Sequence, residues 1–178
     1  ASPDFFSKYY KHISSEDLYR VAFYFLNGDG VKKNYSEAFV TFQLSADRGK
    51  IEAAANACIV YENYLIEANK KLRFKHLFPE EYYVMAANAQ KEWSPHFCWN
   101  LAVYYYEQSE RESIYYLEKA AHYFSLCNSP EGSENARKIN EAIKDYYNSR
   151  SNEPKPSSNS NNSGAAFVFV LATAALLI

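Results

Sequence analysis

Residues 1–147 carry apolar side chains at helical spacing, and this periodicity is the strongest constraint on what the chain folds into. In residues 17–27, for example, Leu18, Val21, Ala22, Phe25 and Leu26 fall along one face of a helix. No alternation of period two persists anywhere, so strands are not expected. The periodicity predicts an all-α fold with helices over about residues 17–27, 35–48, 51–68, 79–92, 95–107, 112–126 and 133–147.

Capping residues mark the ends of the first two predicted helices. Ser14 or Ser15 is a suitable N-cap, because its hydroxyl oxygen accepts a hydrogen bond from an amide of the first turn. Gly28 and Gly30 follow the first helix and Gly49 follows the second. Glycine readily takes the positive φ that a helix C-terminus and a turn require, so these glycines are interpreted as structural.

Small residues recur in these helices at long, regular intervals. Ala22, Cys58 and Ala102 each stand three residues before an aromatic one, at steps of 36 and 44 residues. The next helix of each pair carries two adjacent small residues, at 45–46, 86–87 and 120–121. Small residues let helices approach closely, and short helix pairs must stack on neighbours to bury their apolar faces. The pattern predicts an α-solenoid of about three helix pairs with a C-terminal capping helix, over residues 15–147.

Residues 27–38, NGDGVKKNYSEA, and residues 45–49, SADRG, resemble the Sel-one-like repeat, a relative of the tetratricopeptide repeat. Residues 100–102 and 116–121 match the same pattern, whereas the connector at 65–78 is expanded and lacks glycine. The resemblance covers about residues 15–127 and implies a right-handed, protein-binding solenoid. Its repeat-defining packing positions are Ala22, Phe25, Gly28, Gly30, Ala38, Ala46, Gly49, Cys58, Tyr61, Ala87, Leu101, Ala102, Tyr105, Ala120 and Ala121.

In related solenoids the first helix of each pair lines the concave face. The repeat register therefore nominates partner-binding residues beside the packing positions, although each of them equally suits a core. These candidates are Tyr19, Phe23, Asn56, Ile59, Trp99 and Val103.

Signals of catalysis are missing from the sequence. The chain has neither a phosphate-binding G-x-x-x-x-G-K-[ST] motif nor a dinucleotide fingerprint, and it lacks the S-x-x-K motif that β-lactam-hydrolysing relatives would need. A net charge of −2 argues against nucleic-acid binding. We therefore predict a non-enzymatic protein that uses no cofactor and binds neither nucleic acid nor a small-molecule substrate.

Histidine and cysteine do not converge on a metal. His96 and Cys98 lie about 200° apart on a helix, and His122 and Cys127 about 140° apart. Cys98 opens one predicted helix and Cys127 closes the next, and such ends meet in a helical hairpin. A Cys98–Cys127 disulfide and two buried thiols both remain open. Cys58 is interpreted as a core thiol.

Three further segments bear on partners and compartment. Asn34-Tyr35-Ser36 and Asn161-Asn162-Ser163 have the form of N-glycosylation acceptors. The basic run at 70–76 is interpreted as a solvated loop, with a docking segment for an acidic partner or membrane surface as the alternative.

Both ends of the chain lie outside the predicted solenoid. Residues 1–14 lead into it. Residues 148–164 are rich in Ser and Asn and predict a disordered linker, and residues 165–178 are apolar except for Thr173. A helix of that tail rises about 21 Å, short of a hydrocarbon core of about 30 Å. The tail is interpreted as a GPI-attachment signal, a truncated transmembrane helix or a short anchor. Each attaches the protein to a membrane, and the first two favour a lumenal or extracellular position.

Repeats, linker and membrane segment together resemble the adaptor subunit of the HRD ubiquitin ligase in ER-associated degradation. The resemblance implies a lumenal scaffold whose partners are other proteins. The alternative is a GPI-anchored protein of the cell surface that binds its partner through the repeats.

Overall fold

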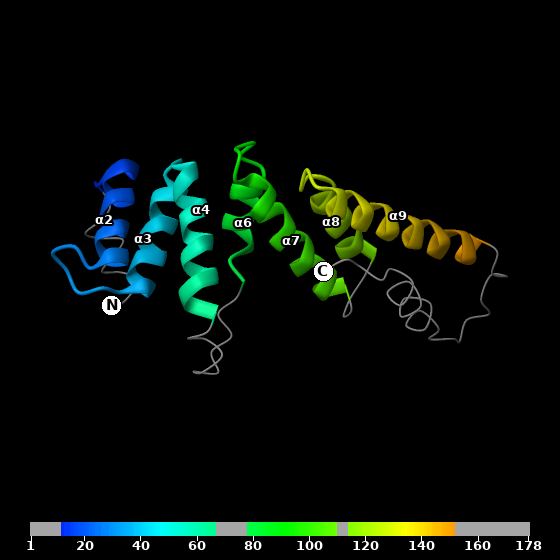
Figure 1. Cartoon of the computed structure of the whole chain (residues 1–178), viewed down its shortest axis with the longest axis horizontal. Coiled ribbons are helices and arrows are strands. Elements are labelled where there is room, and N and C mark those ends of the chain that lie inside the picture. Colours follow the sequence, from blue (N-terminus) through cyan, green and yellow to red (C-terminus); the bar gives the residue numbers. More distant parts are fainter. Residues whose placement is uncertain (1–11, 67–77, 110–113, 152–178) are drawn as a thin grey trace. The chain divides into compact units, whose positions relative to one another are not determined.

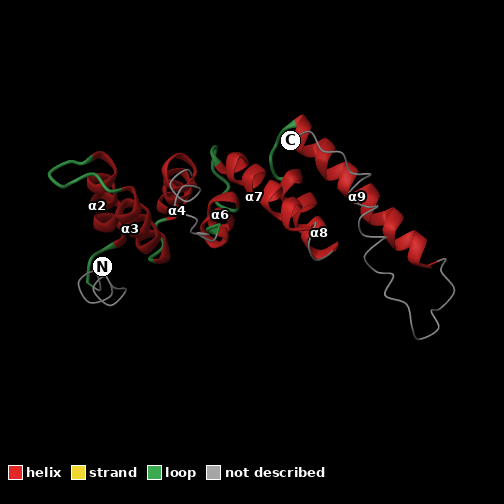
Figure 2. Ribbon diagram, turned by 90° about the horizontal axis from the view of Figure 1, so that it is seen from below, coloured by secondary structure: helices red, strands yellow, loops and turns green. Residues whose placement is uncertain are grey.

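The computed structural model describes residues 12–66, 78–109 and 114–151 (Figure 1). Within these ranges every regular element is helical and no strand is present (Figure 2). The predicted all-α class is therefore confirmed. The chain divides into two compact units, residues 1–89 and 90–178, and each is described by itself. The elements are α2 (Ser15–Asn27), α3 (Tyr35–Asp47), α4 (Ile51–Val60), the π-helical η1 (Tyr61–Leu65), α6 (Glu80–Ala87), α7 (Ser94–Ser109), α8 (Ile114–Ser125) and α9 (Pro130–Ser151).

Helices α2 and α3 form an antiparallel pair in the first unit. At one end, the Asn34 amide donates a hydrogen bond to the Phe25 carbonyl oxygen at 2.9 Å. At the other end, the Ser45 hydroxyl donates to the Ser15 carbonyl oxygen at 2.7 Å. These two bonds fix which ends of the helices lie together, and therefore where the α3–α4 connection begins.

The predicted helix caps are confirmed at both ends of α2 and at the end of α3. The Ser14 hydroxyl oxygen accepts from the Asp17 amide at 3.1 Å. Gly28 closes α2 with a φ of 84°. Gly49 follows α3 with a φ of 91°, and its amide donates to the Ala46 carbonyl oxygen at 2.8 Å. The positive φ at both glycines is the backbone conformation that a side chain would strain.

Helix α4 continues directly into η1, and α6 packs against α4. Helix α6 ends at Ala87, whereas the periodicity predicts a helix as far as residue 92. Gln90 takes a left-handed conformation with a φ of 55°, which an α-helix cannot contain. The earlier end of α6 could therefore not be predicted from the residue type at position 90.

The core of the first unit is built largely from alanine. Small side chains at the contacts let α2, α3, α4 and α6 approach closely, and aromatic rings from the same helices cover them. Its fully or nearly fully buried members are Ala22, Ala38, Phe42, Ala46, Ala53, Ala54, Ala57 and Val60.

In the second unit α7 packs on α8, and α8 packs on α9. The buried apolar side chains include residues of all three helices, and the adjacent alanines at 120 and 121 lie among them. The largest are Phe97, Leu101, Tyr105, Leu117, Phe124 and Ile139. The three helices thus share one core.

Helix α9 is longer than predicted at both ends. It begins at Pro130, not Ser133, because the Ser129 hydroxyl oxygen caps it by accepting from the Gly132 amide at 3.0 Å. It ends at Ser151, so the first four residues of the predicted linker are helical. The basic run at 70–76, the rest of the linker, Asn161 and the apolar tail at 165–178 lie outside the described residues.

Candidate protein-interaction face

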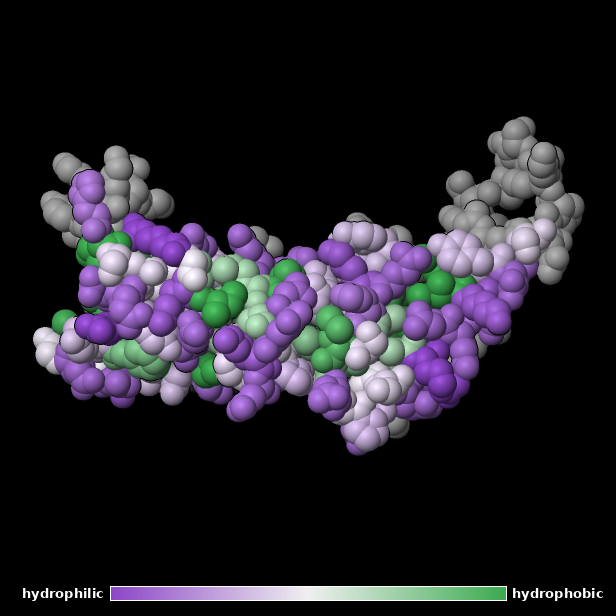
Figure 3. Space-filling model, turned by 90° about the horizontal axis from the view of Figure 1, so that it is seen from above, coloured by the Kyte–Doolittle hydropathy of each residue, from purple (hydrophilic) through white to green (hydrophobic). Residues whose placement is uncertain are grey.

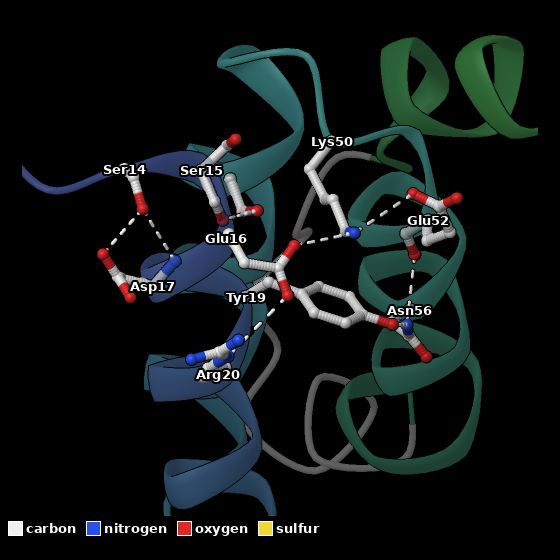
Figure 4. A network of polar contacts seen from close by, with 10 residues as sticks. Ser14, Ser15, Glu16, Asp17, Tyr19, Arg20, Lys50, Glu52 and Asn56 are labelled. Carbon is white, nitrogen blue, oxygen red and sulfur yellow. Dashed lines mark hydrogen bonds and ion pairs between the residues drawn. The ribbon is translucent and has the colours of Figure 1, made fainter.

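The nominated residues of the first unit lie on two helical stripes that meet. Helix α2 contributes Glu16, Tyr19, Arg20 and Phe23, spaced three or four residues apart, and α4 contributes Glu52, Asn56 and Ile59 at the same spacing. Lys50 precedes α4 and lies between the stripes (Figure 4). We call these eight residues the α2–α4 face.

A direct hydrogen bond joins the two stripes. The Asn56 side-chain amide donates to the Tyr19 hydroxyl oxygen at 2.8 Å, and it also donates to the Glu52 carbonyl oxygen at 3.1 Å. The Tyr19 ring contacts Phe23 and the buried Phe42 edge-on, at centroid separations of 5.1 and 5.7 Å. Tyr19 is therefore held from both sides, by packing behind its ring and by a bond at its tip.

Lys50 supplies the ionic part of the same face. Its ammonium nitrogen lies 2.8 Å from a Glu16 carboxylate oxygen, 3.8 Å from one of Glu52 and 5.1 Å from the centroid of the Tyr19 ring. The hydrogen bond from Lys50 holds the pKa of Glu16 below its usual value, and it raises the pKa of Lys50. Both carboxylates are about half exposed, at 48% and 45%, so these contacts orient side chains more than they stabilise the fold.

The position of Lys50 in the chain is unusual for a lysine. Gly49 turns the chain out of α3, and Lys50 occupies the N-cap of α4 without making a side-chain cap bond. Lysine is a poor cap, and a cation is unfavourable at a helix N-terminus. Glu16 and Glu52 offset that charge. The unfavourable N-cap position is the only signal in the sequence that Lys50 has ionic partners elsewhere.

Part of the face is open to a partner. The Arg20 side chain is 66% exposed, and its Nε lies 3.7 Å from Glu16, which is an ion pair too long for a hydrogen bond. Ile59 is 39% exposed although it is aliphatic. The face therefore offers a guanidinium, a carboxylate pair and an apolar side chain around a fixed tyrosine.

Exposed apolar residues elsewhere are scattered. In Figure 3 apolar side chains appear in small groups among polar ones. Among the described residues, the large ones besides Ile59 are Tyr24, Val31, Tyr64, Tyr115, Leu126 and Tyr147. Single exposed apolar side chains are usual on proteins, so exposure alone does not identify an interface.

The nominated residues of the second unit have a different environment. Trp99 is half-buried, and its ring meets Phe124 edge-on at 5.3 Å between centroids. Val103, one turn further along α7, is also half-buried. Phe124 is fully buried, so Trp99 covers the core of the second unit.

No family model, curated protein or solved structure matches this chain. The family resemblance therefore remains a prediction from the sequence. The packing positions that carry the family resemblance fall into two groups. Twelve are outside the turns: Ala22, Ala38, Ala46, Cys58, Tyr61, Ala87, Leu101, Ala102, Tyr105, Ala120 and Ala121 are buried, and Phe25 is half-buried. Gly28, Gly30 and Gly49 have positive φ.

The three cysteines are buried thiols, and no disulfide joins them. Of the two alternatives for Cys98 and Cys127, the structure has the buried thiols. The Cys127 thiol donates to the Tyr123 carbonyl oxygen at 3.2 Å, and burial together with the Cys98 thiol raises the pKa of Cys127 to about 12. Burial also raises the pKa of Cys58. Such thiols are poor nucleophiles and poor metal ligands at neutral pH.

A buried polar contact joins α6 to η1. The Tyr83 hydroxyl donates to a Glu62 carboxylate oxygen at 2.6 Å, and Tyr83 is only 1% exposed. Burial raises the pKa of Tyr83, and the Glu62 carboxylate adds to the shift. The contact ties the π-helical turn to the next helix. It was not predicted, because nothing in the sequence pairs Tyr83 with Glu62.

The described residues offer neither a metal site nor a membrane span. No group of three or more His, Cys, Asp or Glu side chains there is placed to hold a metal ion. No helix in the same ranges is long and apolar enough to cross a membrane.

Proposed function

We propose that this protein is a non-enzymatic adaptor that binds a partner protein through the α2–α4 face. The observation that carries the proposal is the hydrogen bond between Tyr19 and Asn56, with Lys50 beside it. This bond links side chains of two helices into one surface that is partly open to solvent.

Fixed, partly exposed side chains favour binding. A side chain already held in one rotamer loses little entropy when a partner covers it. Tyrosine and arginine are also the residue types that most often dominate interface energetics. Tyr19 meets both conditions, because its ring and its hydroxyl are held by contacts. Arg20 is the second of these residue types, and it is exposed next to Tyr19.

The wider setting of the proposal comes from the sequence. The helical repeats resemble the Sel-one-like family, and an apolar tail follows a Ser- and Asn-rich linker. We propose that the repeats form a solenoid, that the tail attaches the protein to a membrane, and that the helical body lies on the lumenal or extracellular side. An adaptor in ER-associated degradation, similar to that of the HRD ligase, is the specific form we favour.

One pair of matched variants tests the binding face. Ile59→Glu places a charge on it. Val31→Glu makes the same change on an aliphatic of similar exposure, 42% against 39%, in the α2–α3 connector outside the face. Partners cross-linked to the chain in membranes are identified with each variant, and the affinity is then measured with purified proteins. We expect Ile59→Glu to weaken binding at least about tenfold, equivalent to about 1.4 kcal/mol, and Val31→Glu to leave it unchanged.

Circular dichroism first establishes that both variants are folded. A partner that binds wild type, Ile59→Glu and Val31→Glu with equal affinity would reject the α2–α4 face as the binding surface.

A GPI-anchored surface protein is the second candidate, and the apolar tail favours it because small residues and a polar stretch precede the tail. Treatment of intact cells with a phosphatidylinositol-specific phospholipase separates the two. Release of the protein supports the lipid anchor, and retention supports a membrane-spanning tail.

A further inference from the structure

Asn34 caps helix α3 with one atom of its side chain. Its Oδ1 accepts hydrogen bonds from the amides of Ser36 at 3.1 Å and Glu37 at 3.2 Å. Asn34 and Ser36 are both exposed. The tripeptide Asn34-Tyr35-Ser36 is thus held in an Asx-type turn at the surface of the first unit.

The cap leaves the other end of the amide available. The amide oxygen satisfies the helix terminus, whereas Nδ2 is the atom to which an N-linked sugar attaches. An asparagine keeps its carbonyl oxygen after that attachment, so the cap bonds of α3 are retained in the modified chain.

The neighbouring side chain also leaves space. The Tyr35 ring stacks on Tyr64 of η1, with centroids 3.9 Å apart and planes 7° from parallel. Tyr35 is therefore turned into the fold. The backbone N–H of Asn34 donates a hydrogen bond to the Phe25 carbonyl oxygen at 2.9 Å. This bond holds the turn at the surface and does not involve the side-chain amide.

A glycan at this position would be distant from the Lys50 end of the α2–α4 face. Asn34 lies at the start of α3, and Lys50 follows the end of the same 13-residue helix. At about 1.5 Å per residue the two ends are roughly 20 Å apart. The modification therefore lies at the end of the α2–α3 pair opposite to Lys50 and Glu16.

We propose that Asn34 carries an N-linked glycan. The inference rests on the lumenal or extracellular placement proposed above. In the transfer, Nδ2 forms a bond to the anomeric carbon of a polyprenyl-diphosphate-linked oligosaccharide, the bond from that carbon to the diphosphate oxygen breaks, and Nδ2 releases one proton. Nothing is oxidised or reduced.

The test uses the full chain behind a cleavable secretory signal in a eukaryotic cell. The Asn161→Gln background removes the second acceptor tripeptide. Trypsin releases residues 34–48 as one peptide, since it cleaves after Lys33 and after Arg48 and no other Lys or Arg lies between them. We expect that peptide to carry a sugar that peptide:N-glycosidase removes, leaving aspartate at position 34.

Three variants isolate the cause. Asn34→Asp abolishes the modification but keeps a good N-cap, Ser36→Ala abolishes it without touching the cap oxygen, and Ser36→Thr retains it. All three are expected to keep the wild-type melting temperature. Signal-cleaved chain, recovered from membranes or from the medium, in which the peptide 34–48 is unmodified would overturn the inference.

The glycan proposal and the binding-face proposal can be rejected independently of each other. Protein made in bacteria has no glycan, and the Ile59→Glu comparison is carried out on that material. If glycosylated chain melts well below the same chain after enzymatic deglycosylation, the argument that the cap survives attachment is wrong.

Discussion

Gly132 lies in the first turn of α9, beside the end of α8. A Cβ at this position would lie 2.6 Å from the Phe124 carbonyl oxygen and 2.8 Å from the Cys127 Cβ. Non-bonded carbon atoms normally stay about 3.5 Å or more apart. Replacing Gly132 by alanine therefore forces α9 away from α8, because neither obstructing atom belongs to the free end of a flexible side chain.

Two effects oppose each other in Gly132→Ala. Alanine gains at most about 1 kcal/mol over glycine as a helix former, and less in a first turn. Overpacking a filled site costs about 1–3 kcal/mol, and two contacts this short place Gly132 at the upper end. We expect a net loss of about 2 kcal/mol in the free energy of unfolding. For a unit of this size that lowers the melting temperature by roughly 10 °C.

Tryptophan fluorescence measures this loss in the full chain. The two tryptophans, Trp93 and Trp99, both belong to the second unit, so urea or thermal unfolding followed by their emission reports that unit alone. Ser133→Ala is the control, because Ser133 is the next residue of α9 and is exposed. We expect it to be neutral or slightly stabilising. If Gly132→Ala stabilises the unit as Ser133→Ala does, the close approach of α9 and α8 is incorrect.

Three further predictions concern titratable groups. Tyr83→Phe removes the hydroxyl donor to Glu62 and should cost about 1.5–3 kcal/mol. Burial raises the pKa of Tyr83 in the folded state, so the stability that Tyr83 contributes is present below pH ~10 and is lost as pH rises further. Urea midpoints followed by circular dichroism should therefore fall less steeply above that pH in Tyr83→Phe than in wild type. Glu16 should titrate below its usual pKa by NMR, and Lys50→Met should return it upward; an unchanged Glu16 titration would contradict the hydrogen bond. The Cys127 thiol should react with a thiol reagent far more slowly in native than in unfolded protein, and equal rates would contradict its burial.

The sequence predicts helix ends well where they depend on local backbone chemistry. Ser14 as a cap and Gly28 and Gly49 as terminators follow from the residues themselves, and the structure confirms them. It predicts them poorly where an unexpected residue takes a special conformation. Gln90 has a positive φ beyond the end of α6, and no rule based on residue type finds it. Ser129 followed by Pro130 is a recognisable start for α9 that the periodicity alone placed too late.

Contacts between residues far apart in the sequence are the part of the candidate site that is hardest to predict. The repeat register placed Tyr19 and Asn56 on corresponding helices, although the two residues are 37 positions apart. It did not predict the Lys50–Glu16 contact, because complementary charges are common on helix surfaces and many pairings satisfy the same composition. Only the distance between the two side chains selects one pairing.

The repeated positions and the unrepeated ones carry different information. Ala22, Cys58 and Ala102 stand at equivalent places in the predicted repeat, and all three are fully buried, as close helix packing requires. The neighbouring positions diverge: Tyr19 bonds to Asn56 across two helices, whereas Trp99 covers Phe124. Since packing constrains the first set alike and leaves the second free to vary, recognition is expected to depend on the second. A substitution at Tyr19 and one at Trp99 should therefore act differently, the first on binding as well as stability and the second on stability.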